Sequence, residues 1–283
     1  MSVIRAQGLG KEADLDLQTV DVASREAAII ALRSGAADII VTDWLWVSRE
    51  RSLGANFVFY PYSSAIGAIV ANPAKGVAGL HDLVGRKLAV AGGPLDKSWL
   101  LLQAWARRSG VDLRRAANIV YGAPPLLAEK AAQGEVDAAL EYWNFCADLE
   151  AQGFKRVVEI AEVEKALGAT GPVAAIGYVF DGSFAAANGD ALRRFFAVAR
   201  RAKQLIATSP DAWQIVAKQL PARSPEALAS YQKYYARGIP DRAIADEEAD
   251  ARRLFRVLAE IGGSELVGSA DALEPGTYYK GGS

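Results

Sequence analysis

The stretch SGAADIIVTDWLWVSRERSLG at residues 34–54 has a counterpart 99 residues later, QGEVDAALEYWNFCADLEAQG at residues 133–153. Four residues keep their spacing in the two copies, namely Gly35, Asp38, Trp44 and Gly54 in the first and Gly134, Asp137, Trp143 and Gly153 in the second. Each copy predicts a helix end, a glycine turn, a short apolar strand and a second helix. A repeat with so long a period indicates two similar α/β lobes rather than a solenoid, which needs several shorter copies.

The two tryptophans of the repeat are the first candidates for ligand contacts. In open α/β sheets, ligands bind beyond the carboxyl ends of the strands, where Trp44 and Trp143 stand. We expect the two rings to face each other across a cleft, where they could clamp a flat ligand or hold a cation. Asp43 and Glu141, which end the same strands, could pair with a ligand amine, and Asn144 lies beside them. The alternative is that each tryptophan packs the start of the helix that follows.

A second candidate region is KLAVAGGPLDKSW at residues 87–99, which predicts a strand, a tight turn and a helix. Gly93 in the turn allows close backbone approach, and the free N–H groups of the helix start would favour an anionic group together with Lys97 and Ser98. Trp99, one turn into the helix, could face either the ligand or the core. The glycine spacing fits neither a dinucleotide fingerprint nor a P-loop, so we expect no cofactor. The alternative is a tight turn with a solvated lysine.

The order of predicted elements divides the chain. An alternating stretch at residues 14–22 predicts a strand, residues 72–86 hold Pro and Gly and predict a crossing between lobes, and residues 173–180 predict the return crossing. Ser63 and Ser64 lie in a turn near the first crossing, where they could line the cleft or simply form a polar turn. We expect lobe one to comprise residues 1–72 and 177–280, lobe two residues 73–176, and residues 281–283 to be a linker or cloning scar.

The repeat also predicts an absence at the start of the chain. Lobe two begins with a strand at 87–91 and a long helix that ends ARRSG at 106–110. At the same offset, lobe one would need both elements before about residue 7. The chain instead opens with VIRAQGLG at residues 3–10, which is typical of the last turns of that helix. We therefore expect lobe one to lack its first strand.

Composition excludes several classes of function. The chain has 283 residues, a net charge of −1 and 51% hydrophobic residues, which suits a soluble chain with sizeable cores and gives no basic footprint for nucleic acid. Cys146 and His81 are the single cysteine and the single histidine, so no intrachain disulfide and no zinc site built on these ligands can form. We expect Cys146 to pack in a helix and His81 to lie on the surface, and we expect no catalytic residues.

The order and spacing of these pieces resemble the type II periplasmic solute-binding proteins of ABC importers, in the branch for nitrate, sulfonates, taurine and thiamin-precursor pyrimidines. Three stretches carry the resemblance: ALRSGAADIIVTD at 31–43, residues 57–113 from FVFYPYSS to SGVDL, and AAQGEVDAALEYWNFCADLEAQGFKRV at 131–157. The resemblance implies an α/β fold of two lobes joined by two crossing strands, with the ligand in the cleft. It also implies ligand contacts from loops after strands and from the first turn of the lobe-two helix, here Asp43, Trp44, Ser63, Ser64, Gly93, Lys97, Ser98 and Trp143.

We therefore expect a protein that binds a small organic solute and delivers it to the permease of an ABC importer, without catalysis. Two ligand types remain open: a planar or amine-bearing solute such as an aminopyrimidine, which we favour, and a sulfonate or carboxylate held by Lys97. We expect a periplasmic monomer whose signal peptide is absent from this sequence. The alternatives are a ligand-sensing or engineered sensor module on the same fold, or an enzyme like the pyrimidine synthases, whose chemistry one histidine and one cysteine do not suit.

Overall fold

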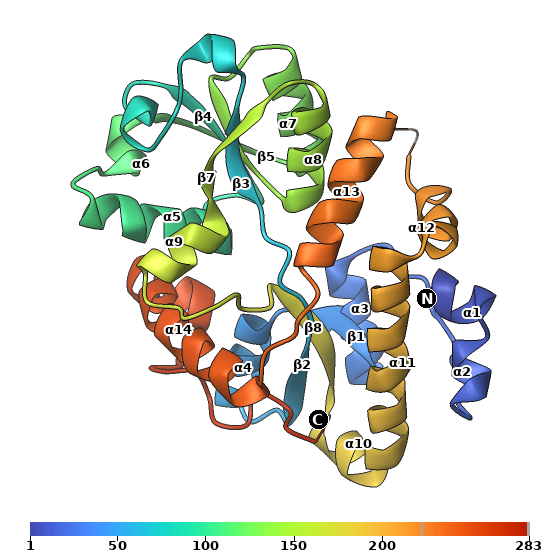
Figure 1. Cartoon of the computed structure of the whole chain (residues 1–283). Coiled ribbons are helices and arrows are strands. Elements are labelled where there is room, and N and C mark those ends of the chain that lie inside the picture. Colours follow the sequence, from blue (N-terminus) through green and yellow to red (C-terminus); the bar gives the residue numbers. More distant parts are fainter. Residues whose placement is uncertain (222, 282–283) are drawn as a thin grey trace.

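The computed structural model describes residues 1–221 and 223–281 and contains two β-sheets, each covered by helices on both faces (Figure 1). The first sheet, in lobe one, has the strand order β1-β8-β2, and the second, in lobe two, has the order β5-β4-β6-β3-β7. The strands are β1 (Ile40–Thr42), β2 (Phe57–Ser63), β3 (Ala68–Ala71), β4 (Lys87–Ala91), β5 (Asn118–Gly122), β6 (Ala138–Glu141), β7 (Lys155–Glu159) and β8 (Ile176–Asp181). The predicted two-lobe α/β fold is confirmed.

The helices of the first lobe are α1 (Ser2–Ala6), α2 (Leu9–Glu12), α3 (Arg25–Ser34), α4 (Trp44–Ser52), α10 (Gly182–Ala187), α11 (Gly189–Thr208) and α12 (Pro210–Ala217). Those of the second are α5 (Lys97–Arg108), α6 (Leu113–Ala116), α7 (Pro124–Ala132), α8 (Trp143–Ala151) and α9 (Ile160–Ala166), with short 3-10 turns η1 (Pro73–Lys75) and η2 (His81–Leu83). The repeat is visible in α4 and α8, which begin and end 99 residues apart.

The chain crosses between the sheets twice, at residues 64–67 and 167–175. The sequence predicted the first crossing at residues 72–86, but the chain crosses earlier. The reason is that β3 already belongs to the second sheet, where it pairs antiparallel with β6 and β7. Two further helices, α13 (Pro225–Arg237) and α14 (Ile244–Val267), also bridge the lobes: α13 packs against α8, and α14 packs against α5 and α4. The lobes are thus held together by four segments.

The strand predicted at residues 14–22 does not form. At the offset of the repeat this segment corresponds to β5, which pairs with β4, and β4 pairs in turn with β6. In the described residues no strand lies beside β1 in the place that β4 takes beside β6, so the segment has no neighbouring strand to pair with. Leu15 and Leu17 still pack against α11, whereas Val20 is exposed.

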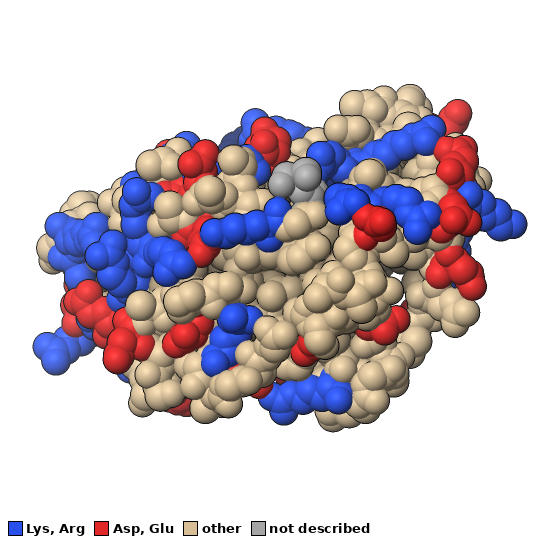
Figure 2. Space-filling model, turned by 90° about the horizontal axis from the view of Figure 1, so that it is seen from below, with Lys and Arg blue, Asp and Glu red and all other residues tan. Residues whose placement is uncertain are grey.

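Charges are mixed over the surface. Figure 2 shows one face on which acidic and basic side chains interleave, with a broad uncharged area across its middle. Of the helices that the structure describes, none has the length and apolar character needed to cross a membrane. Gly281 is the last described residue, so Gly282 and Ser283, which were assigned to a linker, lie outside the described residues.

Candidate functional site

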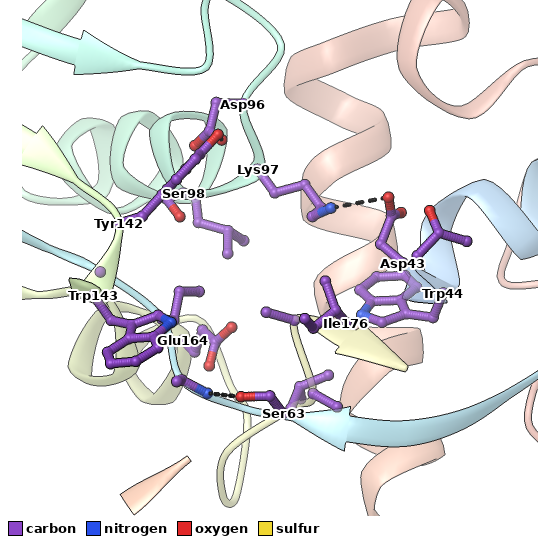
Figure 3. Close-up of a pocket in the computed structure, with 18 of the residues that line it drawn as sticks. Asp43, Trp44, Ser63, Asp96, Lys97, Ser98, Tyr142, Trp143, Glu164 and Ile176 are labelled. Atoms are coloured by element: carbon purple, nitrogen blue, oxygen red, sulfur yellow. Dashed lines mark hydrogen bonds and ion pairs between the residues drawn. The ribbon is translucent and has the colours of Figure 1, made fainter. Parts of the chain in front are cut away.

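A cavity of about 400 Å³ lies between the lobes (Figure 3). Its wall takes residues from the ends of β1 and β2, from the start of β8, from the starts of α3, α4, α5 and α8, from both crossings, and from α9 and α14. Such a position, beyond the carboxyl ends of strands in both lobes, is where open α/β sheets bind ligands. Both halves of the repeat contribute to this wall in an equivalent way, Asp43 and Trp44 from the first and Tyr142 and Trp143 from the second.

Three helix starts converge on this cavity. The helices α4, α5 and α8 begin at Trp44, Lys97 and Trp143, and all three residues line the wall. First-turn N–H groups have no partner within their helix, so a helix start favours negative charge. Two of these starts carry their own carboxylate cap, since Asp43 accepts from the N–H of Trp46 and Asp96 from that of Trp99. No side chain caps α8, so its start remains open for a ligand acceptor.

Asp43 is the centre of an ion-pair cluster in the wall. Its Oδ2 atom lies 3.1 Å from Nη2 of Arg25 and 3.3 Å from Nζ of Lys97, and Arg25 Nε donates to Thr42 Oγ1 at 3.0 Å. Burial alone would raise the pKa of Asp43, but Lys97 and Arg25 outweigh it, so this pKa is lowered and the carboxylate is charged at neutral pH. The Lys97–Asp43 pair also connects lobe two to lobe one.

Asp96 and Tyr142 form a second polar pair in the wall. The Tyr142 hydroxyl donates to Asp96 Oδ2 at 3.2 Å. Burial raises the pKa of Asp96 despite the charge of nearby Lys97, and burial followed by the charge of Asp96 raises the pKa of the Tyr142 hydroxyl. Both groups present hydrogen-bonding atoms at the end of the cavity near α5.

Glu164, on α9, is a carboxyl group that the wall holds in its neutral form. The residue is 5% exposed, and burial raises its pKa to about 8, with a further contribution from the charges of Glu247 and Asp250. At neutral pH Glu164 is therefore protonated, and its O–H can donate a hydrogen bond to a ligand acceptor. The rest of the wall is largely apolar, with Ile66, Leu101, Val173, Ile176, Leu254 and Leu258.

The structure brings seven of the eleven predicted site residues into the cavity wall: Asp43, Trp44, Ser63, Lys97, Ser98, Trp143 and Asn144. Trp44 and Trp143 lie on opposite sides of the cavity (Figure 3). Neither offers a whole free ring face, because Trp44 is 3% exposed and the ring of Trp143 packs edge-on against Tyr231, with 5.3 Å between centroids. The two rings therefore border the ligand space, with little aromatic face left to clamp a flat ligand.

The other four predicted residues are absent from the wall. Trp99 is fully buried in the core and donates from Nε1 to the Tyr121 hydroxyl. Gly93 shapes the turn before α5, where its carbonyl accepts from Asp96 N–H. The Ser64 N–H donates to the carbonyl of Gly238, which fixes the first crossing against α13.

Glu141 is the fourth, and its position removes a proposed partner for a ligand amine. Side chains alternate along β6, so Glu141 shares the sheet face of Ala139, which packs with Cys146 of α8. Glu141 is 1% exposed, and burial raises its pKa to about 8. Because Asp43 is already paired with Lys97 and Arg25, both carboxylates that the sequence offered to a ligand amine are engaged or buried.

Sequence reasoning missed Arg25, Asp96, Tyr142 and Glu164. Arg25 begins α3 directly after its N-cap Ser24, so applying the helix-start rule to a fourth helix could have found it. Asp96 and Tyr142 stood inside stretches already singled out, as the residues just before two helix starts. Glu164 has no local signal, because only the fold brings α9 to the cavity.

Comparisons with known proteins identify the family of the chain and structures of similar fold. The sequence matches the NMT1/THI5-like family over residues 2–213. No curated protein matches the sequence closely enough to serve as a relative. The fold is similar to the periplasmic aliphatic sulphonate-binding protein SsuA of Escherichia coli, with a TM-score of 0.74 and 20% identity over 94% of this chain and 84% of that one.

Two further structures have the same fold. The alkanesulfonate-binding protein SsuA of Xanthomonas axonopodis pv. citri, bound to MOPS, has a TM-score of 0.69 and 16% identity over 98% of this chain and 93% of that one. The desulfurization enzyme DSZB has a TM-score of 0.62 and 15% identity over 92% of this chain and 88% of that one. The fold therefore serves both binding proteins and an enzyme.

Proposed function

Because the chain belongs to the NMT1/THI5-like family, we propose that it is a solute-binding protein that holds a small organic anion between its lobes and delivers it to an ABC importer. The observation that carries this proposal is the cavity of about 400 Å³ between the lobes, to which both halves of the repeat contribute. This volume lies within the range of small-molecule sites. Lobes joined by narrow crossings are suited to hinge closure around a ligand.

The wall supports an anion with an apolar body. Lys97 and Arg25 lie beside Asp43 on one side of the cavity, the uncapped start of α8 lies on the opposite side (Figure 3), and protonated Glu164 adds a donor. Aliphatic side chains from the return crossing and from α14 cover the remainder. A sulfonate or carboxylate with a short hydrocarbon or ring substituent matches both parts. The names of the two sulfonate-binding proteins of similar fold support the same class of ligand.

The arrangement favours binding over catalysis. Cys146 is fully buried, and burial raises the pKa of its thiol to about 12, so it lacks the exposed thiolate of a nucleophile. His81 is exposed in η2 and is not part of the cavity wall. An enzyme of the DSZB kind is the alternative that shares the fold, and a sensor module would share the binding step.

The remaining parts of the proposal concern place and partners. We place the protein in the periplasm, as a monomer that docks on an importer permease, because the binding proteins of similar fold are named as periplasmic. The interleaved charges on the face in Figure 2 and the net charge of −1 favour a small-molecule ligand over nucleic acid. We propose that each lobe is built around one of the two sheets and that the boundaries between the lobes lie at the two crossings.

The test is a ligand panel on protein that has been unfolded, dialysed and refolded to remove any bound solute. Alkanesulfonates, MOPS, aliphatic and aromatic carboxylates, aminopyrimidines and alkylamines would be compared by thermal shift and calorimetry. A ligand at 100 times its Kd adds about 2.7 kcal/mol, which raises the Tm by roughly 5 to 10 °C in a chain of this size.

Two lysine variants locate the site in this assay. Lys97→Met should abolish the shift, whereas Lys165→Met, at an exposed lysine paired with Glu162, should keep it. If no member of the panel shifts the Tm of a correctly refolded protein, the proposed function loses its basis. If the protein chemically converts any compound of the panel, whichever buffer is used, the enzyme would be favoured instead.

A further inference from the structure

A second cavity, of about 530 Å³, lies on the face of the lobe-one sheet that α11 covers. Its wall is formed by β2, β8, α11 and the segment 239–244, and it shares no residue with the cavity between the lobes. Alternation along β2 explains the separation: Phe59 packs on the α4 side of the sheet, whereas Tyr60 points to the α11 side. The proposed transport function does not use this second cavity.

Two cations in this wall have no acidic partner. Lys203 is 7% exposed, its Nζ donates to the carbonyl of Tyr62, and it lies 3.8 Å from the centroid of that ring. Arg200 donates to the Tyr60 hydroxyl at 3.1 Å. In the part of the chain that the structure describes, no carboxylate lies within 4 Å of either cation. Lys203 is a buried cation without a counter-charge, which is costly, so an anion in the cavity would stabilise it, and the exposed Arg200 could contact the same anion.

The other charged groups of the wall keep the cavity basic. Arg242 adds a third cation, but it is engaged with Asp250 and with Pro172 and Thr170 of the return crossing. Asp241 is the acidic residue of the wall, and it is exposed and forms no ion pair. The wall therefore carries three basic groups and one acidic group, with the least solvated cation, Lys203, at its interior.

The apolar part of the wall is aromatic. Tyr60 stacks on Phe196 with 3.8 Å between ring centroids and 15° between planes, and Tyr178 packs against Phe196 as well. Ile239, Pro240 and Ile244 line the side that the segment 239–244 provides. Flat apolar rings beside cations are suited to a planar ligand with one charged end.

We propose that this cavity is a second ligand site, which binds a planar aromatic carboxylate with its carboxylate on Lys203 and Arg200 and its ring against the aromatic wall. Burial and the neighbouring charge of Arg200 lower the pKa of Lys203 to about 7, which is what an uncompensated buried amine produces. A bound carboxylate supplies the missing counter-charge. The volume accommodates a ligand of two fused rings.

The probe is 2-naphthoate, followed by its own fluorescence and by calorimetry, with 2-naphthamide as the neutral isostere and sulfate as the anion without a ring. In Lys97→Met, in which the cavity between the lobes is disabled, we expect saturable one-to-one binding of 2-naphthoate, and binding of the amide and of sulfate at least tenfold weaker. Comparable binding of the amide would contradict the role of the cations. Comparable binding of sulfate would contradict the role of the aromatic wall, and absence of 2-naphthoate binding would overturn the site altogether.

Variants separate this site from the cavity between the lobes. Lys203→Met should weaken 2-naphthoate binding roughly tenfold to hundredfold, as expected for the loss of a charge-assisted hydrogen bond. Arg200→Gln, at an exposed position that tolerates substitution, should weaken it in the same direction and remains informative if Lys203→Met fails to fold. Arg201→Gln, the neighbouring arginine outside the wall, and Lys97→Met in the other cavity should leave it unchanged. Loss of binding in Lys97→Met with retention in Lys203→Met would overturn the proposal without touching the proposed transport function.

Discussion

Asp43→Asn removes one negative charge from the cavity between the lobes and keeps the cap of α4. An asparagine carbonyl can still accept from the Trp46 N–H, which lies 2.9 Å from Asp43 Oδ1. The change removes the carboxylate that competes with a ligand anion for Lys97 and Arg25, so the full charge of both acts on the ligand. We therefore expect the variant to bind organic anions more tightly than the wild type.

Coulomb's law gives the size of the effect. At a separation of roughly 6 Å between Asp43 and a ligand anion, the lost repulsion is about 1 to 3 kcal/mol for effective dielectric constants between those of water and a protein surface. This corresponds to roughly a fivefold to hundredfold gain in affinity. The cost to the unliganded protein is about 1 to 2 kcal/mol, because Arg25 and Lys97 are 47% and 31% exposed and water replaces part of the lost pairing.

Calorimetry with 1-pentanesulfonate and pentylamine, at two salt concentrations, measures the effect. The matched control is Asp181→Asn, which makes the same change at the cap of α10, away from the cavity. The sulfonate should bind more tightly to Asp43→Asn than to the wild type, and its affinity for the control variant should equal that for the wild type. Added salt should reduce the difference in affinity between Asp43→Asn and the wild type. A weaker sulfonate complex, or pentylamine binding that Asp43→Asn abolishes, would refute the reasoning and restore the carboxylate as the ligand-binding group.

Three further predictions concern single residues. The pKa of Glu164 is about 8 in the folded protein and 4.5 in the unfolded chain, so between these pH values the folded state holds a proton that the unfolded state has lost. The contribution of Glu164 to the stability of the fold therefore decreases as the pH rises through this range. Between pH 5 and pH 8, the free energy of unfolding measured in urea should fall by about 3 kcal/mol more for the wild type than for Glu164→Gln. Parallel pH profiles of the two proteins would show that Glu164 does not cause this loss. Gly67→Ala should destabilise the protein by more than about 3 kcal/mol, because an added Cβ would lie 1.6 Å from the carbonyl oxygen of Glu141, whereas Gly79→Ala, with open space, should change the free energy of unfolding little. Cys146 should react with a thiol reagent at the rate of global unfolding, and reaction as fast as in a free thiol would show that it is reachable in the folded state.

Helix starts and turns were readable from the sequence because their signals are local. The repeat predicts two matching helices, and α4 and α8 begin at Trp44 and Trp143. The turn glycines Gly35 and Gly134 adopt positive φ angles of 73° and 76°, which a residue with a side chain rarely adopts. Since ligands collect where strands end and helices begin, these local signals were enough to predict seven residues of the cavity wall.

The sequence by itself therefore determined the two-lobe fold and the places of Trp44, Lys97 and Trp143 at its cleft. Tertiary structure alone decided that residues 14–22 form no strand and that Glu141 faces the core. A strand is stabilised by the partner strand beside it. Whether a carboxylate is free or engaged depends on the charges around it, and Asp43 is engaged by Lys97, which lies far along the chain. Neither partner can be identified from neighbours in the sequence, so the ligand preference depended on contacts that only the folded chain brings together.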